Sequence, residues 1–348
     1  MIEMETSCGT STRSSKVATC EPIGRQHLSN PHLSARCRRP QPKPSAIAET
    51  SLEFSPVTHD AMPEIWRILS QERGRTTDFS YGGLLMWVDY FRYEYCIVDE
   101  TLFIKGRVES DRRRTAFSLP VGRLPLNESL ELLRDYCRRH GYEPIMSAVP
   151  EYALAELEEA GIQNSEELAD WADYLYDAET LASLKGKKMG KKRNHVNQFL
   201  AASPMWSVEP LGARNVAEAV AFMDIFDREG DVTPEARAER ELTRGLLEII
   251  GKGDSHLEGA LLKSGGKVCA FTVGDVKGDT LFVHVEKATR AVPGSYEMIN
   301  REFAAAMMSK YPEIRFINRE DDAGDPGLRA AKESYHPVDR LRKFNVRF

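Results

Sequence analysis

The residue group with the clearest chemical signal is a short run of cations. Residues 185–193 read Lys-Gly-Lys-Lys-Met-Gly-Lys-Lys-Arg, with six cations in nine residues, and no acid lies between positions 180 and 208. If this run is helical, one helix face carries Lys188, Lys191, Lys192 and His195. That face is either a solvated basic surface or a contact for nucleic-acid phosphates, because each neutralised phosphate releases counterions. The predicted phosphate-contacting residues are Lys187, Lys188, Lys191, Lys192 and Arg193.

A second group is acidic. Residues 318–329, Asn-Arg-Glu-Asp-Asp-Ala-Gly-Asp-Pro-Gly-Leu-Arg, place four carboxylates within six positions at the end of an expected strand. These carboxylates repel one another unless a cation is near. One interpretation is that Asp325 caps a helix while the other acids sit in a solvated loop. Another is that Arg319 pairs with one acid while the others bind an ammonium. A divalent metal is a third interpretation, although the spacing matches no established metal-binding loop.

A third group combines an expected strand with the segment Tyr335-His336-Pro337. His284 and Glu286 are two positions apart, so they share one strand face while Val283 and Val285 share the other. Periodicity does not decide which face lines a cleft. His336 is either a hydrogen-bonded structural residue or a general base. The sequence shows no Ser/His/Asp or Cys/His arrangement for nucleophilic catalysis.

Composition restricts the class of protein. The 348 residues are 41% hydrophobic and 29% charged, with a formal net charge of −6 and no apolar stretch of membrane-spanning length. The six cysteines form no CxxC motif, so neither a zinc site nor a disulfide scaffold is expected. Residues 1–50 contain no aromatic residue and are expected to be a disordered tail. These features predict a soluble protein of the cytoplasm.

The elements that must position these groups follow from hydrophobic periodicity. Strands are expected at 52–57, 94–99, 101–108, 113–119, 144–149 and 172–176, and helices at 60–71, 80–92, 127–139 and 151–160. After a basic helix at 179–201 come strands at 206–211, 257–262, 267–275, 280–287 and 314–318, and helices at 215–228, 234–250 and 295–310. A helix opened by Asp325-Pro326 and an extended run to Phe348 complete the chain. The expected N-caps are Ser80, Asn127 and Asp325.

The order of elements within each half is that of the GCN5-related N-acyltransferase fold. We therefore predict an α+β protein of two tandem domains of this type, with mixed, mostly antiparallel sheets flanked by helices. The expected divisions are a tail at 1–50, a first domain at 51–178, a basic linker helix at 179–203 and a second domain at 204–348. The repeat is one of architecture, since the two halves share no convincing residue-level match.

Coenzyme A binding in this fold usually needs a glycine-rich turn whose backbone N–H groups hold the pyrophosphate. The corresponding segments here are 290–295, Arg-Ala-Val-Pro-Gly-Ser, and 119–124, Leu-Pro-Val-Gly-Arg-Leu. Neither fits the pattern, and Pro293 lacks a donor N–H. No resident cofactor is expected, and acetyl-CoA is the less favoured co-substrate.

Several motifs resemble a soluble bacterial family related to the C-terminal domain of phosphatidylglycerol lysyltransferase. The resemblance covers about residues 50 to 348. The runs that carry it are 282–288 (FVHVEKA), 293–303 (PGSYEMINREF), 317–322 (INREDD), 327–337 (GLRAAKESYHP), 87–95 (WVDYFRYEY) and 191–195 (KKRNH).

The resemblance implies a tandem acyltransferase fold and transfer of an aminoacyl group from tRNA to an unidentified acceptor amine or hydroxyl. The donor ester is already activated, so the protein need only orient the acceptor, accept its proton and stabilise the oxyanion. We expect Glu286 or His336 as proton acceptor, and Arg319, Tyr296 or Tyr335 on the ester. The expected substrate-binding residues are Glu320, Asp321, Asp322, Asn318 and Asn300. Open alternatives are a coenzyme-A-dependent N-acyltransferase and a non-catalytic binding module.

Overall fold

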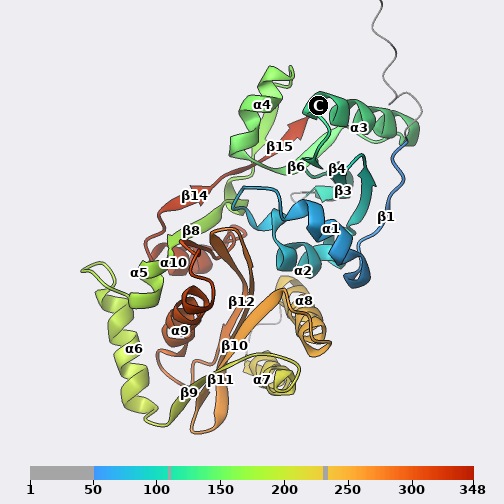
Figure 1. Ribbon diagram of the computed structural model, residues 1–348. Coiled ribbons are helices and arrows are strands. Elements are labelled where there is room, and N and C mark those ends of the chain that lie inside the picture. Colours follow the sequence, from blue (N-terminus) through green and yellow to red (C-terminus); the bar gives the residue numbers. More distant parts are fainter. Residues whose placement is uncertain (1–50, 109–110, 230–233) are drawn as a thin grey trace, which may run out of the picture. The chain divides into compact units, whose positions relative to one another are not determined.

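The computed structural model describes residues 51–108, 111–229 and 234–348, and every structural statement below concerns these residues (Figure 1). Elements of the first half are β1 (Ser55–Pro56), α1 (Met62–Leu69), α2 (Tyr81–Phe91), β2 (Glu94–Val98), β3 (Thr101–Val108), β4 (Asp111–Phe117), β5 (Val121–Gly122), α3 (Leu126–His140), β6 (Ile145–Pro150), α4 (Leu154–Glu159), β7 (Asn164–Glu167) and β8 (Asp173–Asp177).

The second half continues with two helices and repeats the mixed pattern. Its elements are α5 (Ala178–Ser183), α6 (Gly190–Ala202), β9 (Trp206–Pro210), α7 (Val216–Glu229), α8 (Pro234–Gly251), β10 (Leu257–Ser264), β11 (Lys267–Lys277), β12 (Thr280–Ala288), α9 (Ser295–Lys310), β13 (Phe316–Asn318), α10 (Pro326–Glu333), β14 (Asp339–Leu341) and β15 (Lys343–Arg347). The predicted α+β class, with mixed and mostly antiparallel sheets flanked by helices, is confirmed.

The two sheets exchange strands between the halves. One sheet has the order β1-β2-β3-β4-β6-β15-β7, with β5 beside β3, and the other has the order β14-β8-β13-β12-β11-β10-β9. The segment 172–176 was expected to complete the first half, but as β8 it pairs with β13 and β14. The final strand, β15, pairs with β6 and β7 of the first half. The domain boundaries remain predictions, and the pairing of strands crosses them.

Helices cover both faces of the second sheet. On one face α9 packs on β10, β11 and β12 and is itself contacted by α5 and α6. On the other face α7 contacts β11, and α2 from the first half contacts β11, β12 and α8. A single hydrophobic cluster therefore contains residues of both halves, among them Ile65, Leu84, Leu246, Phe271 and Val273. This shared core fixes α2 against the second sheet.

Three capping predictions can be compared with the helix ends. The side chain of Ser80 accepts a hydrogen bond from Gly83 N, and that of Asp325 accepts one from Leu328 N, so both N-caps are confirmed. The Asn127 prediction is wrong, because α3 begins one residue earlier with Pro125 as its N-cap. The extended backbone of Pro125, which its ring restricts, ends the preceding segment there.

The basic segment is not one continuous helix. It divides into α5 and α6 because Leu184 adopts a left-handed conformation with φ 50° and Gly186 follows at φ 90°. Lys187 and Lys188 therefore lie in the loop between the helices, and the single face predicted for Lys188, Lys191, Lys192 and His195 does not form. Among the described residues no helix combines the length and apolar character needed to cross a bilayer.

Candidate active site

The candidate site lies where two parallel strands of the second sheet separate. β12 pairs with β13 only from Thr280/Phe316 to Phe282/Asn318. Beyond this point β12 continues to Ala288, whereas the chain turns away after Asn318. Beyond the paired region Glu286 contacts Arg319, and His284 contacts Glu320. The sequence thus brings the predicted strand group and the acidic group to the same place.

Glu286, Arg319 and Asn300 form the centre of the site. Arg319 Nη2 donates to Glu286 Oε1 at 2.8 Å, and Asn300 Nδ2 donates to Glu286 Oε2 at 3.0 Å. The Arg319 guanidinium also lies 4.7 Å from the centroid of the Tyr335 ring and 5.8 Å from that of Tyr176. Burial would lower the pKa of Arg319, but the charge of Glu286 raises it above its usual value. The guanidinium is therefore cationic at every physiological pH.

Two buried polar atoms of this centre have no hydrogen-bond partner among the described residues. They are Nη1 of Arg319, a donor, and Oδ1 of Asn300, an acceptor. A buried polar atom without a partner costs free energy of about 1–3 kcal/mol, so such atoms in a native protein call for an explanation. A ligand that brings one acceptor and one donor to the two sides of Glu286 would satisfy both.

Tyr335 connects this centre to α6. It is 5% exposed, and Lys192 Nζ lies 3.7 Å from the centroid of its ring. Lys192 Nζ also lies 3.5 Å from Glu297 Oε1, which is 2.8 Å from His195 Nδ1. Burial lowers the pKa of Lys192. Burial would raise the pKa of Glu297, but the hydrogen bond with His195 and the charge of Lys192 lower it.

The five predicted phosphate-contacting cations therefore divide into two sets. Lys187, Lys188 and Lys191 are exposed. Lys192 is buried against Tyr335, and Arg193 donates to the carbonyl oxygens of Leu184 and Gly186, which holds the α5–α6 loop. Both side chains therefore already have partners within the protein, Lys192 at Tyr335 and Arg193 in the α5–α6 loop.

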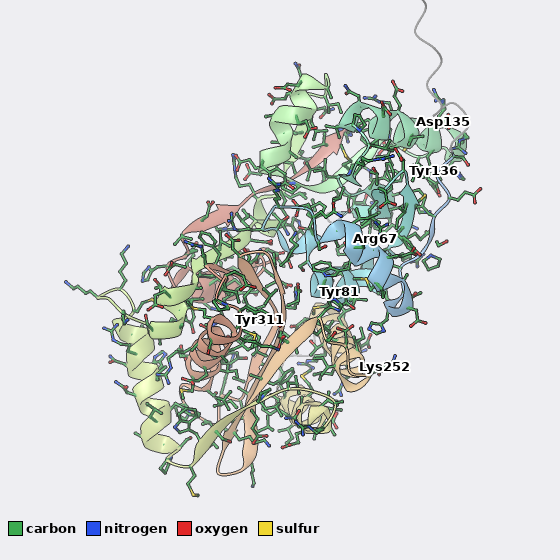
Figure 2. All side chains as sticks on the ribbon, in the orientation of Figure 1. Arg67, Tyr81, Asp135, Tyr136, Lys252 and Tyr311 are labelled. Atoms are coloured by element: carbon green, nitrogen blue, oxygen red, sulfur yellow. The ribbon has the colours of Figure 1, made fainter. Side chains whose placement is uncertain are left out.

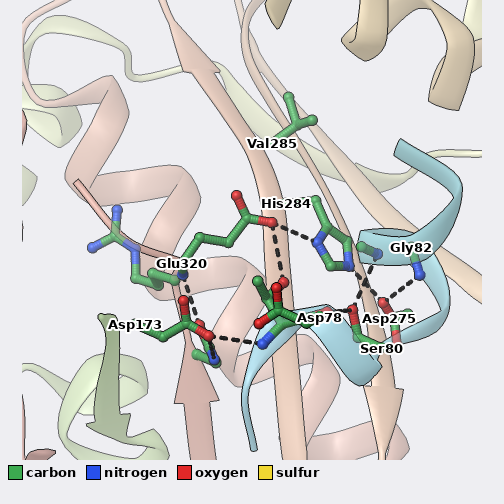
Figure 3. Close-up of polar contacts among 12 residues, drawn as sticks. Asp78, Ser80, Gly82, Asp173, Asp275, His284, Val285 and Glu320 are labelled. Carbon is green, nitrogen blue, oxygen red and sulfur yellow. Dashed lines mark hydrogen bonds and ion pairs between the residues drawn. The ribbon is translucent and has the colours of Figure 1, made fainter. Parts of the chain in front are cut away.

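A second polar cluster surrounds His284 (Figure 3). Its Nε2 lies 2.5 Å from Asp275 Oδ1, and its Nδ1 lies 2.8 Å from Glu320 Oε1. Burial would lower the pKa of His284, but these two hydrogen bonds raise it to about 10. The ring is consequently an imidazolium between two carboxylates, not a general base.

Local backbone features place His284 there. Val283 pairs with Gly274 and Val285 with Val273, so His284 is the extra residue of a β-bulge in β12. Opposite it, the N-terminus of α2 approaches closely, and Gly82 N donates to Asp275 Oδ1 at 2.9 Å. A Cβ at Gly82 would lie 2.5 Å from the His284 ring, so only glycine permits this approach. Sequence periodicity did not reveal the bulge.

A buried lysine joins this cluster to the C-terminal strand. Lys343 Nζ lies 2.8 Å from Asp78 Oδ2 and 2.8 Å from Asp173 Oδ1. Asn318 Nδ2 donates to Asp173 Oδ2 at 2.9 Å and to Arg75 O at 2.6 Å. The fully buried Asn318, predicted to bind substrate, therefore has a structural role in joining β8, β13 and the segment before α2.

The three acids predicted to bind an ammonium have different surroundings. Glu320 is paired with His284 and also accepts from Thr77 Oγ1 at 3.3 Å. Asp322 is buried and accepts two hydrogen bonds from Arg329, at 2.8 and 3.0 Å. Burial would raise its pKa, but Arg329 and Tyr174 lower it to about 2. Asp322 is thus a structural ion-pair partner, which differs from the predicted substrate contact.

Of the three acids, Asp321 has the fewest side-chain contacts that stabilise its negative charge. Its side chain accepts from Ala323 N at 2.8 Å, and burial raises its pKa to about 6. Lys332 lies beside it and donates to Arg319 O at 2.6 Å and to the carbonyl oxygen of Asp321. Burial lowers the pKa of Lys332. In the described part of the chain, no group of His, Cys, Asp and Glu side chains has the arrangement of a metal site.

Two predicted catalytic residues lie at the edge of this centre. Tyr296 is half-buried in the hydrophobic cluster that contains Tyr335. His336 is exposed on the turn after α10 with φ 56°, because the preceding Tyr335 points inward to Arg319 and Lys192. Of the two residues expected as proton acceptor, Glu286 and His336, only Glu286 therefore lies inside the site.

Sequence reasoning missed Asp275, Asp173, Asp78 and Lys343. The available signal was a charged residue inside an apolar strand, as in Thr-Val-Gly-Asp-Val at 272–276. Lys, Glu, Arg and Asp are almost never fully buried unless paired, so such positions indicate a partner from elsewhere in the chain. The sequence alone does not identify that partner.

Comparison with known proteins agrees with this architecture. The family model for the C-terminal part of phosphatidylglycerol lysyltransferase matches residues 70–347. A conserved protein of unknown function from Bacteroides thetaiotaomicron VPI-5482 is 30% identical, with 85% of this chain and 99% of that chain covered and a TM-score of 0.76. No curated protein gives a significant match.

More distant structures share the fold. L-PGS from Bacillus licheniformis is 14% identical over 83% of this chain and 91% of that chain, with a TM-score of 0.58. FemX is 12% identical over 85% of this chain and 97% of that chain, with a TM-score of 0.53. At these identities the two structures show that the fold is shared. Since the family model spans most of the described residues, the chain belongs to the family of the phosphatidylglycerol lysyltransferase C-terminal domain.

Proposed function

We propose that the protein transfers an aminoacyl group from aminoacyl-tRNA to an acceptor amine or hydroxyl. The observation that carries the proposal is the pair of unpartnered buried atoms, Arg319 Nη1 and Asn300 Oδ1, on either side of Glu286. An α-aminoacyl ester offers the complementary groups, a carbonyl oxygen for Arg319 and an ammonium N–H for Asn300. An acetyl thioester has only the carbonyl.

In this proposal Arg319 Nη1 donates to the carbonyl oxygen and stabilises the negative charge that develops there. Each Glu286 oxygen accepts one hydrogen bond and keeps a second lone pair, so the carboxylate can accept a proton from the attacking amine or hydroxyl. The new bond forms to the acyl carbon and the ester bond to the terminal ribose breaks. The proton then returns from Glu286 to the leaving ribose hydroxyl.

The other residues have supporting roles. Tyr335 packs on the Arg319 guanidinium and holds its plane, and Tyr296 lines the adjacent apolar wall. Lys187, Lys188 and Lys191 supply exposed positive charge for tRNA phosphates. Such an enzyme would act in the cytoplasm, where charged tRNA is found.

The test is a transfer assay with total charged bacterial tRNA carrying radiolabelled amino acids. We expect protein-dependent loss of label from tRNA that Glu286→Gln abolishes and Arg319→Lys lowers by about 100-fold, the size of effect of one oxyanion donor. Glu302→Gln is the matched control, because Glu302 pairs with Arg301 on the same helix, α9, outside the site. Label loss that is identical in parent and Glu286→Gln would refute the proposal.

A further inference from the structure

A cavity separate from the Glu286 centre lies at the turn between β11 and β12. Its volume is about 500 Å³, and its walls include Trp66 of α1, Tyr81 of α2, His256 and Tyr311. Tyr81 and Tyr311, labelled in Figure 2, come from α2 and from the residue after α9. A carboxylate, that of Glu313, also lines the cavity, two residues after Tyr311. Aromatic rings and one acid therefore line one cavity from four separate segments.

The rings are held by contacts among themselves. Tyr81 stacks on His256 with centroids 4.5 Å apart, and Trp66 meets the edge of Tyr81 at 5.4 Å. These contacts position the aromatic walls without a ligand, so little ordering remains to be done on binding.

The hydroxyl groups of both tyrosines donate to buried or half-buried acids. Tyr81 Oη donates to Asp254 Oδ2 at 2.6 Å, and Tyr311 Oη donates to Glu258 Oε1. Burial, together with these bonds, raises the pKa of both phenols. Donation to a carboxylate also leaves more electron density on each phenol, which makes the ring faces more negative. Lys310 Nζ, 5.2 Å from the centroid of Tyr311, already makes a cation–π contact there. The cavity surface therefore favours positive charge carried on apolar groups.

We propose that this cavity binds an organic cation, an ammonium group that carries methyl or methylene substituents. The aromatic walls contact the substituted ammonium, and the exposed Glu313 carboxylate supplies the counter-charge. This binding does not depend on the proposed aminoacyl transfer, because none of the cavity-lining residues belongs to the Glu286 centre. A nucleobase would stack on the same rings and could donate an N–H to Glu313, but it carries no positive charge and so gains no cation–π interaction.

The test is calorimetric titration of the full chain with choline, and with the uncharged analogue in which a tert-butyl group replaces trimethylammonium. We expect saturable one-to-one binding of choline and at least tenfold weaker binding of the analogue, since only the cation gains the cation–π and carboxylate interactions. Tetramethylammonium should compete with choline.

Variants locate the site. Trp66→Leu and Tyr311→Leu should each weaken choline binding about tenfold, and Glu313→Gln about threefold. Trp171→Leu, a half-buried tryptophan outside the cavity, is the matched control. Trp66→Leu affects packing and could prevent folding. Glu313→Gln changes an exposed residue, so it keeps the test valid even if the Trp66→Leu protein does not fold. Equal binding of the analogue, binding of adenosine in place of choline, or affinities unchanged by all three variants would overturn the proposal.

Discussion

His284 Nε2 and Asp275 Oδ1 are 2.5 Å apart and both side chains are almost fully buried, in a contact that joins β12 to β11 beside the N-terminus of α2. With Glu320 on the other ring nitrogen, the imidazolium is stabilised from two sides. Because this histidine carries a proton that most histidines lose near neutral pH, it gives the fold a defined pH dependence.

The first prediction concerns this imidazolium. Its pKa rises from about 6.5 in the unfolded chain to about 10 in the folded protein, so its contribution is complete below pH 6.5 and is lost as pH rises toward 10. We expect His284→Gln to be less stable than the parent near pH 6, with a difference that narrows steadily up to about pH 10. Urea denaturation at several pH values measures this, and a difference that stays constant over the range would contradict it.

The acids at 320 and 321 should respond oppositely to loss of charge. The pKa of Asp321 is raised to about 6, so the folded protein favours its protonated form, and ionisation destabilises the fold as pH rises from about 4 to 6. We expect Asp321→Asn to stabilise the protein by about 1–2 kcal/mol at pH 7.5 and by nothing below pH 4. Thermal melts at the two pH values give the comparison.

Glu320→Gln provides the contrast, because it leaves the buried imidazolium of His284 with one anion instead of two. We expect it to cost about 1.5–3 kcal/mol at pH 7.5, the usual value of a hydrogen bond to a charged group. Equal melting temperatures for the two variants would mean that the acids are equivalent, as the sequence suggested.

The exposed lysines should account for the salt dependence of tRNA binding. Each lysine that neutralises a phosphate contributes about 0.9 to the slope of log K against log salt. Replacing Lys187, Lys188 and Lys191 by Ala should therefore lower the slope by up to about 2.7 while the melting temperature stays the same. Lys192→Ala should instead lower the melting temperature and leave the salt slope unchanged, because Lys192 is buried between Tyr335 and Glu297. Filter binding over a salt series distinguishes the two outcomes.

Acetyl-CoA should form no one-to-one micromolar complex. The pyrophosphate would need the first turn of α9, but a Cβ at Gly294 would lie 2.0 Å from the carbonyl oxygen of His195, so the backbone of α6 covers that turn. A carbonyl oxygen is also unfavourable next to phosphate. Calorimetry with acetyl-CoA tests this, and a saturable micromolar isotherm would favour the coenzyme-A-dependent alternative.

Local sequence signals predicted the helices and strands well, but they did not predict which distant residues contact one another. The bounds of α9 and the Asp325 cap follow from periodicity and capping chemistry that act within a few residues. The break in the basic helix at Leu184 was not predicted. Leu184 has a left-handed conformation and lies in the hydrophobic cluster that contains Phe199, and periodicity does not reveal such tertiary contacts.

In the candidate site, too, individual residues were predicted better than the contacts between them. The strand pattern predicted Glu286 and the acidic motif predicted Arg319, whereas Asn300, which joins them from α9, was predicted only from the family resemblance. The interior charges Asp173 and Lys343 are 170 positions apart in the chain, so only the tertiary fold pairs them.

The exchange of β8 and β15 has a consequence for how this architecture can change. Strand β15 lies between β6 and β7, and β8 lies between β13 and β14. If the chain were divided after Asp177, the first piece would lack β15 from its sheet, and the second piece would lack β8 from its sheet. Lys343 adds a buried charge that needs acids from the first half. Neither half should therefore fold as an independent module when it is expressed alone.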